Sequence, residues 1–238
     1  MSLEQLTDAE EKLRESILAH ECQFGSNHVL TARMILRLAN FFGRIGDKDK
    51  AAILIRRALF SFELVLGPSA PEVADCVLEL VKVDPNTDIE TVLPLLRRAQ
   101  IVREQQFGAE SRQVAEVCGY LGGAYFSSGK WNDAVDAYRR SLNILEKILP
   151  ETDPERIQTS GRLASSYVRA GRPIEAEKLI RGILDFRKEL DLPHDNDYLL
   201  LLSDYAQLQH RQSKFEEERR ILLEALQVLV ESVGPTAP

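Results

Sequence analysis

One spacing dominates the sequence, because short stop signals recur every 41 to 43 residues along all 238 residues. The second residue of each signal is Gly25, Gly67, Gly108, Pro150, Asp191 or Gly234. A separate set of small residues keeps the same spacing: Ser16, Ala58, Ala99, Ser141, Gly182 and Ala225. Two sets with one period indicate that a single structural module is repeated along the chain.

Each module carries the pattern of two helices. Apolar residues between the stop signals follow the helical period of 3.6, as in Leu142, Leu145, Ile148 and Leu149. A tight turn is expected 11 or 12 residues before each small residue, at Gly46, Gly129, Gly171 and Ser213, with Thr87 in the same place in the weakest module. Nothing in the chain favours strands, so the sequence predicts an all-α fold of about eleven helices.

Candidate helix starts are given by three capping-box spacings. Thr7 precedes Glu10, Ser69 precedes Glu72, and Thr152 precedes Glu155 by three residues. In a capping box the hydroxyl and the carboxylate each accept a hydrogen bond from a free backbone amide at the start of a helix. We therefore expect helices to begin beside these three hydroxyl residues.

The period also sets the predicted domain organisation. An unpaired helix at 2–24 is followed by five repeats, at 26–67, 69–108, 110–150, 152–191 and 193–234, so residues 1–238 form one repeat domain. A two-helix module cannot bury its apolar side alone, and stacking the modules buries a continuous core. The predicted fold is therefore an α-solenoid of antiparallel helix hairpins.

Two stretches resemble a known family. Leu121-Gly122-Gly123-Ala124-Tyr125, followed by Gly129-Lys130-Trp131 and Tyr138-Arg139-Arg140-Ser141-Leu142, is similar to the longer tetratricopeptide repeat of the kinesin light chain type, and so is the stretch around Leu163-Ala164 and Tyr167. The resemblance implies a right-handed solenoid in which the first helix of each hairpin lines a concave groove. It also implies a scaffold that binds a protein or peptide, needs no cofactor and is not an enzyme.

Composition excludes several classes of function. The net charge is −7, which argues against a general binder of nucleic acid or of anionic membranes, since these need a cationic surface. No run of 18 apolar residues is present, and the first eleven residues carry acids where a signal peptide carries basic residues. Cys22, Cys76 and Cys118 are odd in number and far apart, which is typical of free cysteines in a reducing compartment. We expect a cytoplasmic protein.

Motifs for catalysis, phosphate binding and metal binding are missing from the sequence. The segment Gly123 to Lys130 has one residue too many for a phosphate loop, and Trp131 follows where a hydroxyl residue would be needed. His20, His28, His194 and His210 have no Cys or carboxylate at ligand spacing. No Gly-x-Ser-x-Gly elbow occurs. The sequence therefore predicts no catalytic residue and no metal site.

The predicted groove contains a local row of arginines. Arg37 and Arg44 are seven residues apart, as are Arg162 and Arg169, so each pair lies on one side of its helix. Guanidinium groups suit carboxylates, which favours an acidic segment or a C-terminal carboxylate as ligand. The full set of predicted groove residues is Arg33, Arg37, Asn40, Arg44, Tyr120, Phe126, Arg162, Ser165, Arg169, Gln207 and Arg211. The alternative is that these arginines form ion pairs with acids of adjacent repeats.

Two specific kinds of groove are disfavoured. Clamps for the acidic tails of chaperones use Lys and Asn, but the corresponding positions here are Leu36, Val77, Gly119, Gly161 and Ser203. The asparagines common in kinesin light chain grooves are also replaced, by Arg37, Leu78, Tyr120, Arg162 and Asp204. The identity of the partner therefore does not follow from the resemblance.

Two further functions stay open besides the adaptor. The last helix is rich in apolar residues, among them Leu222, Leu223 and Leu226, which one preceding helix does not cover. The chain is therefore expected to be part of a longer protein, or to cover its terminal helices by self-association or with a partner. The second reading is thus a structural module that self-assembles, and the third is a sensor segment of a larger signalling protein.

Overall fold

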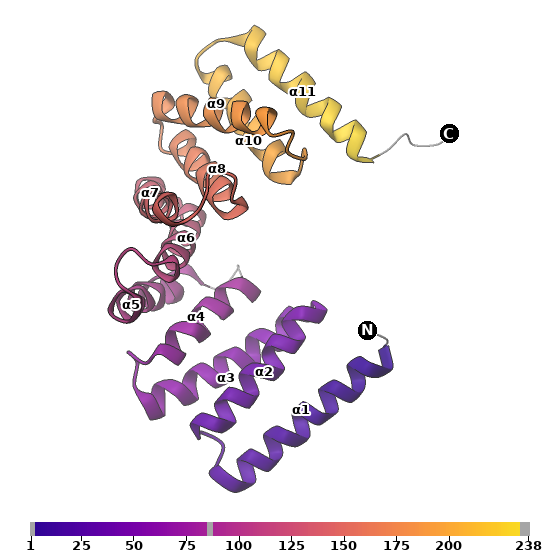
Figure 1. Ribbon diagram of the computed structural model, residues 1–238, viewed down its shortest axis with the longest axis vertical. Helices are drawn as coiled ribbons and strands as arrows, with labels where there is room; N and C mark the ends of the chain where they lie inside the picture. The colour runs from indigo at the N-terminus through magenta and orange to yellow at the C-terminus, as the bar shows by residue number, and fades with distance from the viewer. Residues whose placement is uncertain (1–2, 85–87, 234–238) are drawn as a thin grey trace. The chain divides into compact units, whose positions relative to one another are not determined.

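The computed structural model describes residues 3–84 and 88–233, and these residues form eleven α-helices and no strand (Figure 1). The helices are α1 (Leu3–Phe24), α2 (Val29–Ile45), α3 (Lys48–Leu66), α4 (Pro71–Val83), α5 (Ile89–Phe107), α6 (Arg112–Ser127), α7 (Trp131–Ile148), α8 (Pro154–Arg169), α9 (Pro173–Glu189), α10 (Asn196–Arg211) and α11 (Phe215–Val233). The prediction of an all-α fold with about eleven helices is confirmed. Residues 2 and 234, which bound the predicted repeats, lie outside the described residues.

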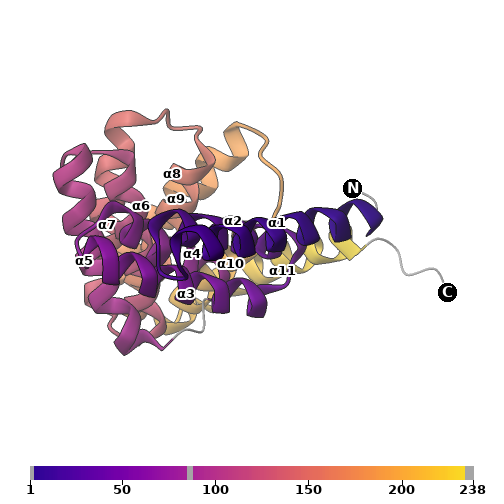
Figure 2. The ribbon, with the colours of Figure 1, turned by 90° about the horizontal axis from the view of Figure 1, so that it is seen from below.

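Helices adjacent in sequence pack on one another. The chain divides into two compact units, residues 1–124 and 125–238, and the division falls within α6. In the first unit α1 packs on α2, α2 on α3, α3 on α4, and α4 on α5. In the second unit α7 packs on α8, α8 on α9, and α10 on both α11 and α8. Figures 1 and 2 both show α1 and α2 side by side. This sequential packing of antiparallel helices is that of an α-solenoid.

Aspartates, rather than the predicted hydroxyl residues, cap four of the described helix starts. The side chains of Asp47, Asp88, Asp153 and Asp195 accept a backbone amide at the start of α3, α5, α8 and α10. Helices α4 and α8 begin two residues after Ser69 and Thr152, as expected, but the predicted caps were wrong: Ser69 precedes the uncapped Ala70, and Thr152 precedes the cap Asp153. The predicted start at Thr7 was wrong, because Thr7 lies inside α1. A proline in the first turn of α4 and α8 fixes the start one or two residues later than the hydroxyl.

Left-handed backbone marks the turns between paired helices. Gly46 ends α2 at φ 87°, and its amide donates to the carbonyls of Gly43 and Phe42. Gly129 and Gly171 have φ 73° and 70°, and Ser213 has φ 59°. These four positions are the predicted turns, and the positive φ explains why glycine is preferred there. Thr87, the fifth predicted turn position, lies outside the described residues.

Small residues occupy the close contacts between helices. Ala39, Ala164 and Ala206 are buried on α2, α8 and α10, and Ala58 and Ala99 are buried on α3 and α5. Helix axes approach to about 8–10 Å only where the side chains at the contact are short. These buried small residues leave room for a neighbouring helix, whereas Gly182, at the same place in another repeat, is exposed.

One core position of α10 carries an amide where other repeats carry an aromatic ring. Gln209 is 0% exposed and lies three residues after Ala206. Counting three residues from Ala39 and Ala164 leads to Phe42 and Tyr167, which are both buried. Within the described residues, the amide oxygen of Gln209 has no hydrogen-bond partner. Such a group loses its hydration without compensation, which costs about 1–3 kcal/mol.

Replacing Ala164 by leucine should destabilise the second unit. The larger side chain has no space in the contact that α8 makes with its neighbours, and overpacking costs about 1–3 kcal/mol. Urea denaturation followed by far-UV circular dichroism measures the loss. Ala19→Leu, at an exposed position of α1, is the control and should leave the unfolding midpoint unchanged. Equal midpoints for Ala164→Leu and the wild type would contradict the packing argument.

Replacing Gln209 by leucine should stabilise the protein, because a buried unpaired amide oxygen is exchanged for an apolar group of similar volume. We expect a gain of about 1–2 kcal/mol in the free energy of unfolding. Gln106→Leu, at an exposed position of α5, is the matched control with no expected gain. A lower unfolding midpoint for Gln209→Leu would show that the amide is paired in solution.

Candidate binding face

Helices α8 and α10 are the first helices of consecutive hairpins, and they contact each other directly. Asp153 and Pro154 fix the start of α8, and the turn at Gly171 follows its end. We define the α8–α10 face by six residues: Arg162, Ser165 and Arg169 of α8, and Asp204, Gln207 and Arg211 of α10. Five of these are predicted groove residues, and the structure brings them together on two touching helices.

The two arginines of α8 are exposed and directed along one side of the helix. Seven residues separate Arg162 from Arg169, which corresponds to a rise of about 10 Å. Both side chains are exposed. Neither forms an ion pair with another residue in the part of the chain that the structure describes. The exposed guanidinium groups are therefore accessible to a ligand, while the charge of Arg169 also acts on the Asp204 carboxyl.

The other polar residues of the face link α8 to α10. The Ser165 hydroxyl donates to the carboxylate of Asp204. Burial raises the pKa of the Asp204 carboxyl above its ordinary value, although the Ser165 hydrogen bond and the charge of Arg169 act in the opposite direction. The guanidinium of Arg211 donates to the carbonyl of Val168 at 3.1 Å. These contacts hold the two helices in register.

Gln207 and Phe126 occupy less open positions than predicted. The amide oxygen of Gln207 is buried, and among the described residues it has no hydrogen-bond partner. Phe126, at the end of α6, packs edge-on against Trp131 with ring centroids 5.2 Å apart. The ring of Phe126 therefore stabilises the turn between α6 and α7 rather than standing free.

A pocket of about 500 Å³ lies beside Arg162. Its walls come from α8, the end of α9, the connection between α9 and α10, and α10. Apolar lining is provided by Ile157, Ile183, Leu192, Leu200 and Leu201, with Gly161 and Ser165 on α8. The size falls within the range of about 300–1,000 Å³ that is usual for ligand pockets.

A buried arginine shapes one wall of this pocket. Arg187 of α9 is only 7% exposed. Its guanidinium donates to the carbonyl of Pro193 and to the Asp195 carboxylate, the latter at 2.9 Å, and stacks on the ring of Tyr198 at 5.4 Å. The contacts hold the connection between α9 and α10 against the helices. The sequence analysis did not predict this arrangement. The only signal for it in the sequence is the length of the connection between α9 and α10.

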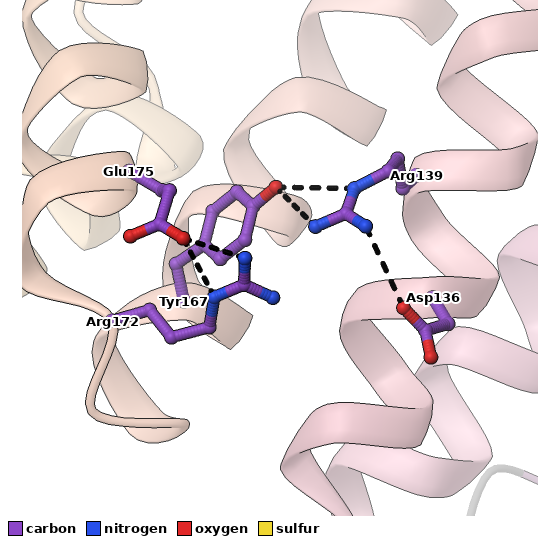
Figure 3. A network of polar contacts seen from close by, with 5 residues as sticks. All are labelled: Asp136, Arg139, Tyr167, Arg172 and Glu175. Carbon is purple, nitrogen blue, oxygen red and sulfur yellow. Dashed lines mark hydrogen bonds and ion pairs between the residues drawn. The ribbon is translucent and has the colours of Figure 1, made fainter.

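A second network supports α8 from the side of α7 and α9 (Figure 3). The Arg139 guanidinium donates to the Tyr167 hydroxyl at 2.9 Å and lies 3.7 Å from Asp136. Arg172 stacks on the Tyr167 ring at 5.0 Å and donates to Glu175 at 2.8 Å. The hydrogen bond from Arg172 lowers the pKa of Glu175. The position of α8 is therefore fixed by three neighbouring helices.

The remaining predicted groove residues belong to the first unit. Arg33 forms an ion pair with Glu72 of α4 at 2.9 Å, as the intramolecular alternative anticipated. Arg37, Asn40 and Arg44 are exposed on α2. Tyr120 of α6 is partly buried beside the ammonium group of Lys82, which lies 5.9 Å from the centre of its ring. These residues belong to the first unit, whereas those of the α8–α10 face belong to the second.

A contact register between the first helices of consecutive repeats accounts for the ion pair of Arg33. Side chains meet 39 residues apart in three cases, Arg33 with Glu72, Gln158 with Asp197, and Ser165 with Asp204. The same step from the exposed arginines Arg37, Arg44, Arg162 and Arg169 leads to Cys76, Val83, Leu201 and Leu208. None of these four residues offers a carboxylate. The identities of these four residues can be read from the sequence, but the step of 39 residues between contacting side chains is known only from the structure.

The described residues contain no group of three or more His, Cys, Asp or Glu side chains placed to hold a metal ion. None of the described helices combines the length and apolar character needed to cross a membrane.

Comparison with known proteins finds similar repeats in a family model and in solved structures. A family model for the tetratricopeptide repeat matches residues 114–155. No curated protein sequence gives a significant match to the chain. Among solved structures, that of the putative kinesin light chain nearly identical TPR-like repeats of Podosopora anserina superposes with a TM-score of 0.70 at 18% identity, covering 86% of this chain and 98% of that chain.

Two other solved structures share the fold. BtubC (BKLC) from P. vanneervenii has a TM-score of 0.68 at 25% identity and covers 81% of this chain and 77% of its own. The apo form of RapI has a TM-score of 0.62 at 14% identity, with 94% of this chain and 92% of that chain covered. The predicted resemblance is confirmed: residues 114–155 match the tetratricopeptide repeat, and the fold of the chain is similar to that of kinesin light chain-like repeat structures.

Proposed function

We propose that the chain is a protein-interaction scaffold that binds an extended acidic segment of a partner along the α8–α10 face. The tetratricopeptide fold supports the general role of a scaffold, since its stacked helices offer long surfaces for other chains. The observation that carries the specific site is the pair Arg162 and Arg169, exposed on one side of α8 and without intramolecular ion pairs among the described residues.

The spacing of these two groups suits an extended peptide. Alternate side chains of an extended strand point the same way at intervals of about 6.5–7 Å, and long arginine side chains adjust over a few ångströms. Carboxylates at positions two to four residues apart are then within reach of both guanidinium groups. Each contact is a charge-assisted hydrogen bond, which contributes more than a neutral one.

The adjoining pocket adds selectivity. Its lining is mostly apolar, and it opens beside Arg162, so it suits an apolar side chain next to the acidic residues of the partner. The cytoplasmic location stays a prediction from the sequence.

Replacing both Arg162 and Arg169 by alanine should weaken binding of acidic peptides at least 10-fold at low salt. The probe is a set of fluorescent peptides with two glutamates and one apolar residue in varied order, and anisotropy gives the dissociation constants. Because surface charges are screened within about 10 Å at 0.1 M salt, the difference should shrink in 0.5 M NaCl. Lys178→Ala, an exposed lysine of α9, is the matched control. Equal affinity of the double variant and the wild type would remove the site from the α8–α10 face.

Filling the pocket should reduce peptide affinity without loss of stability. A methyl group at Gly161 would meet no atom within 4 Å, so the site has open space. Alanine there should raise helix stability by up to about 1 kcal/mol, while the longer side chain of Gly161→Leu enters the pocket. We expect Gly161→Leu to bind peptides with an apolar residue about 10-fold more weakly than Gly161→Ala, and both to unfold no earlier than the wild type. Unaltered affinity of Gly161→Leu would show that the pocket stays empty in the complex.

A further inference from the structure

The last helix presents a partly exposed apolar stripe. Ile221 and Val228 of α11 are buried and pack toward α10. On the opposite side, Leu222, Leu223, Leu226, Leu229 and Val230 are between 46% and 60% exposed. At 3.6 residues per turn, all five lie within about 60° of the direction of Leu226, so they form one stripe.

The stripe is symmetric about Leu226. Leu222 and Val230 lie four residues to either side of Leu226, and Leu223 and Leu229 lie three residues to either side. A two-fold axis beside Leu226 therefore brings Leu222 of one copy level with Val230 of the other, and Leu223 level with Leu229. A surface that is complementary to itself in this way suits an isologous contact.

Charge selects the antiparallel arrangement of the two helices. α11 begins with Glu216, Glu217 and Glu218, followed by Arg219 and Arg220. In a parallel pair the exposed Arg219, which lies within about 20° of the direction of Leu226, would face Arg219 of the second copy. In the antiparallel pair the two Arg219 residues are about 21 Å apart along the helix, at a rise of 1.5 Å per residue. That distance exceeds the screening length of about 8 Å at physiological salt.

The area sets the strength of the contact. If each of the five side chains loses roughly 80 Å² of exposed surface, two copies remove about 800 Å² of apolar surface from water. The aliphatic parts of flanking residues such as Arg219 and Gln227 add to this. Stable interfaces bury about 1,200–2,000 Å² in total, so the pair lies below that range, among weak and transient contacts. The contact therefore corresponds to a reversible dimer.

We propose that two copies of the chain form a two-fold dimer through antiparallel pairing of the α11 stripes, with Leu226 at the axis. This goes beyond the peptide-binding function, because α11 carries none of the residues of the α8–α10 face. The two surfaces also differ in chemistry: one is cationic and the other apolar.

Sedimentation velocity of the full chain between 1 and 200 µM tests the dimer. We expect a monomer–dimer equilibrium with a midpoint on the order of 10 µM that persists in 0.5 M NaCl. Leu226→Arg should raise the dissociation constant at least 10-fold, with an unchanged circular dichroism spectrum because residue 226 is half exposed. Ile174→Arg, at an exposed apolar position of α9, is the control and should dimerise as the wild type does. A monomer at all concentrations would overturn the proposal.

A second exposed apolar row offers the competing interface. Leu18, Phe60 and Ile101 occupy equivalent positions of α1, α3 and α5, and each is more than half exposed. Loss of the dimer in Phe60→Arg but not in Leu226→Arg would assign the contact to that row and refute the α11 stripe.

Cysteine cross-linking tests the two-fold axis. The background is Cys22→Ser, because Cys22 is free and exposed. A cysteine at Leu226 faces its own copy across the axis, within the Cβ separation of about 4 Å that a disulfide needs. A cysteine at Leu222 lies about 12 Å from its counterpart in the antiparallel pair. Mild oxidation should therefore link Leu226→Cys but not Leu222→Cys, and equal linking of both variants would show a parallel pair and overturn the arrangement.

Discussion

Burial of each helix's apolar side against the next helix in sequence is the interaction on which the structure depends. No contact between distant parts of the chain is needed for this, since α2 packs on α3 and α10 on α11 within about forty residues. Each close contact needs a short side chain, and Ala39, Ala164 and Ala206 provide it. Stability is then approximately a sum of local contributions, so a defect such as the unpaired amide of Gln209 is tolerated in one repeat.

The same repetition determines which surfaces are left for function. In a stack of helices, one side of each helix is used for packing and the other meets solvent. Charged residues on the solvent side pair with the following repeat only where the sequence offers an opposite charge at the contact. Arg33 finds Glu72 in this way, whereas Arg162 and Arg169 are followed by Leu201 and Leu208 at the corresponding step. A cationic surface on an acidic protein follows from this mismatch between repeats.

Much of the fold could be predicted from the sequence because its determinants are local. The period placed the helices, and the turn residues Gly46, Gly129, Gly171 and Ser213 were identified because left-handed backbone strongly favours a few residue types. The exact capping residues of the helices were harder to predict. Asp153 and Thr152 are both good caps, and which of them caps α8 depends on the neighbouring proline. The pocket depends on how Arg187 holds the connection after α9, through side-chain contacts across six to eight residues that the helical period does not specify. Which of the groove arginines form ion pairs could not be predicted, because this depends on which residues of adjacent repeats meet. The sequence of a single repeat does not reveal that step.

The two proposed surfaces of the second unit reinforce each other. α11 packs on α10, and α10 carries half of the α8–α10 face, so a dimer through α11 would hold two such faces in one particle. A partner with two acidic segments, or a partner that is itself a dimer, would then bind the second face as an intramolecular step. Because apolar pairing is insensitive to salt while arginine contacts weaken with it, rising ionic strength would release the partner and leave the dimer intact. Concentration of the chain would thus control avidity, and the charges of the face would control which segments are bound.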